Sequence, residues 1–317
     1  MSFDLYAELT AQSQCPAPAK LPGGLASGFV EGCTCWFAKG ELVGDEKAGA
    51  RKKNDARNCY MKHAQAGKLT VLKELAVLLD RAPSPLQPRW LAIAVAFTLQ
   101  APWYSKDDRP FHVLDNPVRK DRVFGVPFMA AAGWKGLLRW ACRMEARLRQ
   151  HLAEHGTGPE AMQRWEDPDW IVHLFGNAKG EDEEFSRGAL RCFPTWFDRI
   201  GFEVINPHDR ARRAGTHPIL YEVVPAGTAG TLRLLYAPAP GLAERQGVKP
   251  AVAVGRLLDA TEKLLRDYGF SAKRTAGWGI ARIDRAEIRS ARESECGTMA
   301  QVRAALGRVL GQGGRTG

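Results

Sequence analysis

The chain has 317 residues, and lysine plus arginine exceed aspartate plus glutamate by ten. Such a charge favours a polyanionic partner or an acidic membrane surface, and the length can bury one large core or two smaller ones. No run of eighteen apolar residues is present, which argues against a membrane-spanning helix. Residues 1–14 lack the pattern of a secretory signal. Seven cysteines at irregular spacing do not suit a secreted disulfide framework, so we expect a cytoplasmic protein.

Residues 1–88 differ from the rest of the chain and predict a loop-rich N-terminal extension. Proline and glycine recur at 15–18, 21–24 and 83–85. Residues 47–73 carry eight lysines and arginines but one aspartate. Two interpretations of this basic stretch remain open: a solvated segment, or a segment that lies on a phosphate backbone.

Four cysteines of the extension form a candidate zinc site. They are Cys15, Cys33, Cys35 and Cys59. A region with little core of its own benefits from a metal clip, although the spacing is not that of paired CxxC motifs. Cys59 with His63 is an alternative ligand set.

Residues 89–285 predict an α+β core domain with helices on one face of a sheet. The predicted strands are 90–99, 189–197, 219–236 with a turn at 225–227 that allows a hairpin, and 280–283, and the predicted helices are 133–152 and 251–268. Their order is compatible with a βαββαβ plan. Residues 286–317 are expected to form a partly helical tail.

The helix at 133–152 is amphipathic and carries a basic ridge beside its apolar stripe. Lys135, Arg139, Arg143 and Arg147 follow one another at spacings of four. A solvated helix face explains this pattern as well as a phosphate-binding face does.

The first chemical constellation spans residues 114–121 (LDNPVRKD) and the start of the helix at 133–139 (GWKGLLR). Asp115 lies in a turn sequence, and turn formation alone explains it. Arg119 and Lys120 form a basic pair. Backbone N–H groups at a helix N-terminus can receive a phosphate, and Lys135 would add charge there.

The second constellation is the glycine-rich run at residues 269–280 (GFSAKRTAGWGI). Glycine permits close approach to a ligand, Lys273 and Arg274 can contact phosphates, and Trp278 can stack on a base. The run lacks the spacing of dinucleotide-binding and Walker motifs, which argues against those ligands.

Together, in this order and separation, the two constellations resemble the RAMP superfamily, and in particular the backbone subunits of type III CRISPR effector complexes. The resemblance covers residues 90–285. It implies a ferredoxin-like, modified RNA-recognition fold that binds guide RNA, with target RNA and other effector subunits as partners. The residues that it assigns to RNA binding are Arg119, Lys120, Lys135, Arg139, Arg143, Lys273, Arg274, Gly277, Trp278 and Gly279.

In catalytic members of this family, the aspartate that matches Asp115 cuts target RNA. The implied chemistry is attack of a ribose 2′-hydroxyl on the adjacent phosphate with Mg²⁺ or Mn²⁺. One departure is the sequence AAAG at 130–133, where relatives have a proline, a glycine and two serines. Another is the segment 203–209, which resembles the non-catalytic subunit that caps the filament.

Several alternatives therefore stay open. A scaffold or cap would bind guide RNA without cutting. A stand-alone ribonuclease would need a convergent acid–base pair; His208 and Asp209 are adjacent and are better explained as a structural loop, whereas His112 could shuttle the proton of the 2′-hydroxyl. A partner that is a membrane or an acidic protein is the remaining alternative.

Overall fold

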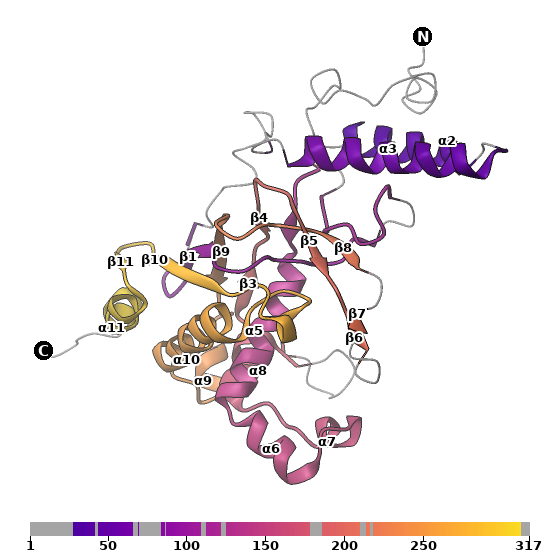
Figure 1. The fold of residues 1–317 in the computed structure, drawn as a ribbon. Coiled ribbons are helices and arrows are strands. Elements are labelled where there is room, and N and C mark those ends of the chain that lie inside the picture. The colour runs from indigo at the N-terminus through magenta and orange to yellow at the C-terminus, as the bar shows by residue number, and fades with distance from the viewer. Residues whose placement is uncertain are drawn as a thin grey trace, which may run out of the picture.

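Five antiparallel strands form the central sheet (Figure 1). The computed structural model describes residues 28–41, 44–65, 69, 84–85, 87–108, 112–121, 125–177, 186–209, 214–215 and 218–311. In spatial order, the strands of the sheet are β11 (Ser294–Gly297), β10 (Ala281–Arg289), β1 (Leu91–Leu99), β9 (Ala229–Tyr236) and β3 (Leu190–Cys192). Each strand runs antiparallel to its neighbours, so the first strand in the chain lies in the middle.

Helices pack against this sheet, and the described residues also form three separate two-stranded sheets. The helices are α2 (Gly28–Glu41), α3 (Glu46–Ala64), α5 (Ala131–Glu145), α6 (Leu148–His155), α7 (Pro159–Gln163), α8 (Asp169–Phe175), α9 (Leu242–Arg245), α10 (Pro250–Lys263) and α11 (Met299–Val309), with a π-helical turn η2 (Leu264–Tyr268) and a 3₁₀ turn η3 (Arg274–Ala276). The small sheets pair β2 (Phe128–Met129) with β4 (Thr195–Trp196), β5 (Gly201–Ile205) with β8 (Ile219–Val223), and β6 (His208–Asp209) with β7 (Ala214–Gly215). No described helix is long and apolar enough to cross a membrane.

The connections of the main sheet follow the ferredoxin-like plan. In chain order the elements are β1, α5, β3, β9, α10 and β10, which is βαββαβ. Their spatial order places the fourth strand beside the first, the first beside the third and the third beside the second. This confirms the predicted α+β class and its βαββαβ connectivity.

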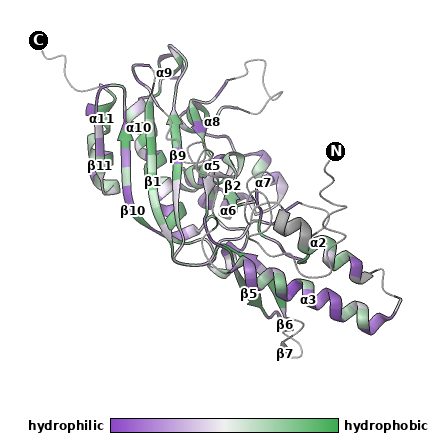
Figure 2. Cartoon of the chain, turned by 90° about the horizontal axis from the view of Figure 1, so that it is seen from above, coloured by the Kyte–Doolittle hydropathy of each residue, from purple (hydrophilic) through white to green (hydrophobic). Residues whose placement is uncertain are grey.

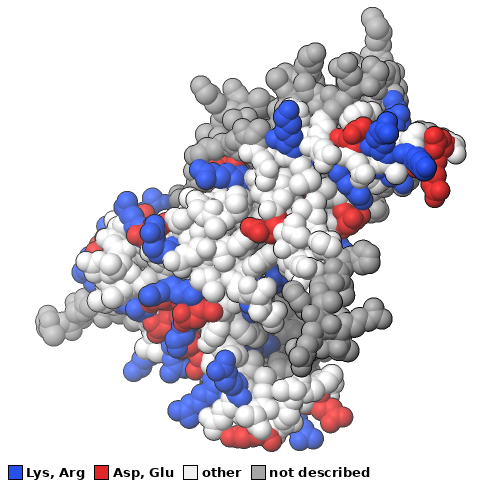
Figure 3. Space-filling view, in the orientation of Figure 1, with Lys and Arg blue, Asp and Glu red and all other residues white. Residues whose placement is uncertain are grey.

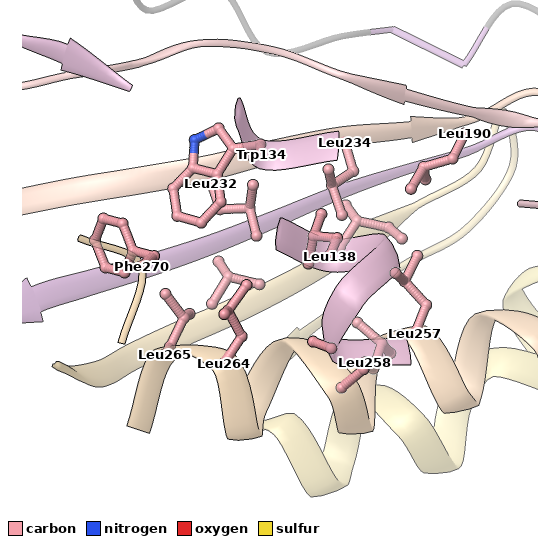
Figure 4. Close-up of a cluster of buried hydrophobic side chains, with 14 of the residues drawn as sticks. Trp134, Leu138, Leu190, Leu232, Leu234, Leu257, Leu258, Leu264, Leu265 and Phe270 are labelled. Carbon is pink, nitrogen blue, oxygen red and sulfur yellow. The ribbon is translucent and has the colours of Figure 1, made fainter. Parts of the chain in front are cut away.

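The alternation of side chains along the strands explains the main core. Ile93, Val95 and Phe97 are buried, whereas the small residues between them are partly exposed. Strand β9 alternates in the same way. Figure 4 shows leucines of α5, β9 and α10 meeting Trp134 and Phe270 between the sheet and the helices. Helix α10 therefore faces the sheet with the apolar stripe that its sequence predicts.

The N-terminal extension, predicted to be rich in loops, contains a helical hairpin that shares a hydrophobic cluster with the core domain. Helices α2 and α3 pack together, and Tyr60 of α3 is fully buried. A second hydrophobic cluster joins Cys33, Ala56 and Tyr60 to Leu114 and Ile200. Helix α3 thus packs against the segment that follows β1 and against the start of β5 (Figure 2), and is part of the folded domain.

Two predicted elements are broken where the sequence gives little warning. The helix predicted at 133–152 begins at Ala131, ends at Glu145 and restarts as α6, because Arg147 adopts a left-handed conformation with φ of 70°. The strand predicted at 189–197 is interrupted at Pro194, which cannot donate a ladder hydrogen bond, and its two parts belong to different sheets.

The hairpin considered for residues 219–236 is wrong. Strand β8 pairs with β5, whereas β9 pairs with β1 and β3, so the turn between them leads from one sheet to another. Strand β10 is longer than predicted, because charged residues on its outer face conceal the alternation. It continues through Arg289 and pairs with β11, so the C-terminal region belongs to the sheet; α11 then packs on it with Val302 and Leu306 buried.

Candidate nucleic-acid interface

The N-terminus of α5 and the glycine-rich loop lie together and line one groove. Its volume is about 340 Å³. The lining residues are Tyr104, Ser105, Arg119, Met129, Ala130, Ala132, Gly133, Leu137, Phe270, Ser271, Ala272 and Arg274. The N-cap of α5 is Ala130, which provides no side-chain cap, so the N–H groups of the first turn are available beside the groove. This end of the helix can therefore receive an anion.

The glycines of the loop are required by its tight packing. Gly279 has φ of +81°, and a Cβ atom there would lie 2.5 Å from the backbone nitrogen of Ser271. The Gly279 N–H donates to the carbonyl of Pro102 at 2.8 Å, and that of Ala272 donates to Tyr104 at 2.8 Å. Gly277 also has positive φ, but a Cβ atom there would meet no atom within 4 Å. The loop is thus held against the end of β1.

Arginines at the groove supply positive charge. The Arg274 guanidinium lies 4.4 Å from the centre of the Trp140 ring, which fixes its position by a cation–π contact. Arg119 pairs with Asp108 at 3.1 Å. A backbone hydrogen bond and the charge of Arg119 lower the pKa of the exposed Asp108 carboxyl. Lys135 is exposed on the second turn of α5, where it can add a further cation.

The loop residues Lys273 and Trp278 contact buried aromatic rings. Lys273 Nζ lies 5.1 Å from the centre of the Tyr221 ring. The Trp278 ring is edge-on to Tyr104 and Tyr221, and the residue is only 9% exposed. Burial, with smaller charge effects, raises the pKa of Tyr104 to about 12. The expectation that Trp278 stacks on a base is therefore corrected: its ring is part of the core beneath the loop.

Lys120 also requires a correction, because its ammonium group lies in the interior. Lys120 and Glu222 form an ion pair in which both side chains are 0% exposed. Glu222 also accepts a hydrogen bond from the Tyr60 hydroxyl, and at 2.9 Å from the backbone N–H of Val118. A buried ammonium group cannot touch a phosphate, so Lys120 is structural and connects α3, β8 and the segment 112–121.

Arg139 and Arg143 bind a carboxylate at the junction of α5 and α8. Arg143 donates to both oxygens of Asp167 at 2.6 and 2.8 Å, and Arg139 Nε donates at 2.8 Å. The Asp167 side chain is 4% exposed. Burial alone would raise the pKa of Asp167, but hydrogen bonds from Arg143, Trp165 and Arg139 outweigh it and lower the pKa. The basic ridge thus has a structural role here, and its contact with RNA stays a prediction.

Asp115 lies at the surface, beside α3. Its side chain is 85% exposed and pairs with Arg57 at 3.5 Å. Arg57 Nε also donates to the carbonyl of Val113 at 3.4 Å. His112 Nδ1 accepts from the backbone N–H of Leu114 at 3.0 Å, and its ring is edge-on to Tyr60. The aspartate can therefore reach a ligand in solvent, whereas His112 is oriented by the local backbone.

The cysteine set is not brought together in the part of the chain that is described. Cys15 lies outside the described residues, and Cys59 is disulfide-bonded, so it offers no thiolate. Cys33 is buried in the second cluster, and desolvation raises its pKa to about 12. Within the described ranges no three His, Cys, Asp or Glu residues are placed to hold a metal ion. The zinc site stays a prediction. The side chains of His208 and Asp209 also lie outside the described part.

Some residues that organise the interface are absent from the sequence prediction. Glu222 is the main one, and the sequence does contain a signal for it: a carboxylate within the otherwise apolar and aromatic run 219–224 (ILYEVV) requires a buried partner. Asp167 and Arg57 carry no such signal, because charged residues surround them in the sequence. Only the folded chain pairs them with the basic ridge and with Asp115.

Comparison with known proteins gave one family and several solved structures. Residues 42–282 match the model of the RAMP superfamily. A chain in "Cryo-EM structure of the Type III-B Cmr-beta bound to cognate target RNA" is 12% identical with a TM-score of 0.42, covering 83% of this chain and 82% of that one. A chain in "Crystal structure of Csm3-Csm4 subcomplex in the type III-A CRISPR-Cas interference complex" is 12% identical with a TM-score of 0.40, covering 69% and 96%. The search of curated proteins gave no match.

Proposed function

Because this chain belongs to the RAMP superfamily, we propose that it is a guide-RNA-binding backbone subunit of a type III CRISPR effector complex. It would act in the cytoplasm with guide RNA, target RNA and other effector subunits as partners. The observation that carries the proposal is the groove between α5 and the glycine-rich loop. Two motifs separated by more than a hundred residues supply a helix N-terminus and arginines to that single groove.

The groove suits a phosphate of the guide backbone. The free N–H groups at the start of α5 provide directed donors, and Arg119 and Arg274 provide charge. The run AAAG at 130–133 lacks the serine hydroxyls that relatives carry there, so binding here depends on backbone donors. Such contacts recognise the backbone and not the base sequence, as a subunit that accepts different guides requires.

Asp115 is the proposed cutting residue, and its exposure allows contact with a target strand. Mg²⁺ commonly uses one or two carboxylates together with phosphate oxygens of the substrate, and Asp115 offers one exposed carboxylate for that arrangement. As the 2′-oxygen bonds to phosphorus, its proton would pass to solvent and the bond to the 5′-oxygen of the next nucleotide would break, and an ion held by Asp115 would supply positive charge at the phosphate. Arg57 lies 3.5 Å from the Asp115 carboxylate and is its neighbour at the surface.

Guide binding is tested with the full chain and labelled single-stranded RNA. We expect Lys135→Ala combined with Arg274→Ala to weaken binding and to reduce the dependence of log K on log salt by about 1.4, at about 0.7 for each lost phosphate contact. Arg149→Ala combined with Arg164→Ala removes two exposed charges elsewhere and is the control. Equal losses in both double variants would exclude the groove as the guide site.

Cleavage is tested in the complex reconstituted with guide RNA and labelled complementary target in Mg²⁺. We expect Asp115→Ala to lower the rate of cutting by about 10²-fold or more while guide binding persists. Glu160→Ala, which removes an exposed carboxylate from α7, is the control. Unchanged or absent cutting would contradict catalysis by Asp115 and favour the scaffold or cap.

A further inference from the structure

One face of α3 carries a continuous row of basic and amide side chains. Lys47, Arg51, Asn54, Asn58 and Lys62 follow at spacings of three and four, which places them on one side of the helix. They are all exposed, whereas the opposite side of α3 is buried at Gly49, Ala56, Tyr60 and Ala64. We call the five exposed residues the α3 row. At 1.5 Å per residue the row is about 22 Å long, enough to follow several phosphates.

Among the described residues, no ion pair holds the cations of the α3 row. Neither Lys47, Arg51 nor Lys62 takes part in one, and Arg51 has the like charge of Lys47 four residues before it and the opposite charge of Asp55 four residues after it. Some arginines of other elements do form ion pairs, for example Arg303 with Glu262 and Arg308 with Glu293. In Figure 3 lysines and arginines lie over the hairpin at the upper right, with acidic side chains between them.

Helix α3, which carries the α3 row, lies beside the segment that contains Asp115. Helix α3 is anchored by the bond from Tyr60 to the buried Glu222, and its Arg57 contacts Asp115 at 3.5 Å and Val113 at 3.4 Å. An anionic strand along α3 would therefore run beside the segment that carries Asp115. The groove between α5 and the glycine-rich loop does not include any residue of α3, so the two basic surfaces are separate.

The chemistry of the α3 row favours RNA over other anionic partners. A helix that lies on a membrane presents its apolar face to lipid, but the apolar face of α3 is already buried in the second cluster. Asn54 and Asn58 interleave with the cations and can bond to phosphate, ribose or base edges. We propose that the α3 row is a second RNA-binding surface, which holds the backbone of single-stranded RNA beside Asp115. The inference rests on the proposed function, to which it adds a surface for the strand that is to be cut.

The test measures binding of the full chain to labelled single-stranded RNA over a range of salt concentrations. The variant Lys47→Ser/Arg51→Ser/Lys62→Ser removes the charges of the α3 row. The control Arg149→Ser/Arg164→Ser/Lys249→Ser removes three exposed charges from other elements. We expect the first variant to bind RNA at least about tenfold more weakly than wild type. The slope of log K against log salt concentration should fall by about 2, because three phosphate contacts at about 0.7 each are lost. The control should bind like wild type. Lys47→Arg/Lys62→Arg should retain binding.

The other possible results either contradict the α3 row or separate it from the groove. Equal losses in the α3 and control variants, or no loss in either, overturn the inference. The inference is also overturned if polyglutamate displaces the labelled RNA as effectively as an unlabelled RNA of the same charge does, because the surface would then recognise any polyanion. If only Lys135→Ala/Arg274→Ala weakens binding, the groove stands and the α3 row fails. If only the α3 variant weakens binding, the α3 row stands and the groove fails.

Discussion

Three groups from two segments meet at Glu222, and each of them satisfies part of its buried carboxylate. Lys120 supplies the opposite charge, and Tyr60 and the Val118 N–H supply hydrogen bonds. Lys120 Nζ donates in addition to the carbonyl of Val118 at 3.3 Å. Because desolvation of two charges is costly, such a pair is stable only when all of these contacts are present.

Removing one partner of this ion pair is expected to lower the free energy of unfolding more than removing both partners. Glu222→Gln leaves the Lys120 ammonium buried without a counter-charge, and we expect a loss of about 3–5 kcal/mol in the free energy of unfolding. Lys120→Met/Glu222→Leu should recover much of that loss. Urea unfolding measures the stability of both variants, and Glu203→Gln, at an exposed position, is the control. A double variant as unstable as Glu222→Gln would contradict the argument.

At the scale of elements, the glycine-rich loop shows how backbone conformation positions a binding residue. Its glycines at 269 and 279 fill places where a Cβ atom would lie within 2.6 Å of backbone atoms. The resulting path sends Trp278 inward and leaves Arg274 over Trp140 at the groove. The sequence shows that glycine is needed in this loop, but the direction of each side chain depends on how the loop packs against the end of β1.

Two glycines of this loop form a matched pair for experiment. Both have positive φ, so alanine at either position is strained by about 1–3 kcal/mol. Gly279→Ala adds a clash with the Ser271 backbone, whereas Gly277→Ala meets open space. We therefore expect Gly279→Ala to be clearly less stable in urea unfolding and to bind RNA more weakly. Equal effects of the two substitutions would show that φ alone matters.

At the scale of the whole molecule, buried polar groups connect the helical layer to the sheet. His173 of α8 is fully buried, and its ring nitrogens lie 2.7 Å from Gln246 Oε1 and 2.7 Å from the Tyr236 hydroxyl. The amide oxygen only accepts, so Nδ1 donates to it and Nε2 accepts from Tyr236. Burial lowers the pKa of His173, although the bond to Gln246 opposes this. The histidine is therefore held neutral.

This network predicts a loss of stability in mild acid. Histidine in the unfolded chain titrates near pH 6.5, and the pKa of His173 in the folded chain is lower. As the pH falls below about 6.5, the unfolded state binds the proton first, and stability declines until the pH reaches the folded pKa. Urea unfolding from pH 7 to pH 5 should show this decline, and His173→Gln should reduce it. His155→Gln, at an exposed position, should leave the loss of stability between pH 7 and pH 5 unchanged. If both variants keep the full loss, a group other than His173 causes it.

The sequence by itself determined the class of the fold, because periodicity is local. The apolar, partly β-branched run 90–99 and the apolar stripe of 251–268 identified the central strand and the main covering helix, and of the motif residues assigned to RNA, Arg119 and Arg274 line the groove. The broken helix at Arg147 and the interrupted strand at Pro194 were missed: Arg147 adopts a positive φ that its side chain does not announce, and the missing N–H of Pro194 was not weighed.

Only the tertiary structure decided which charges are available to a ligand. Lys120 and Arg274 both stand in basic motifs, yet one pairs with Glu222 in the interior and the other lies at the groove. The difference arises from partners about a hundred residues away, because the free energy of a charge depends on its solvent and counter-charge, and both are set by packing. For the same reason, the sequence could not show that α3 lies beside Asp115.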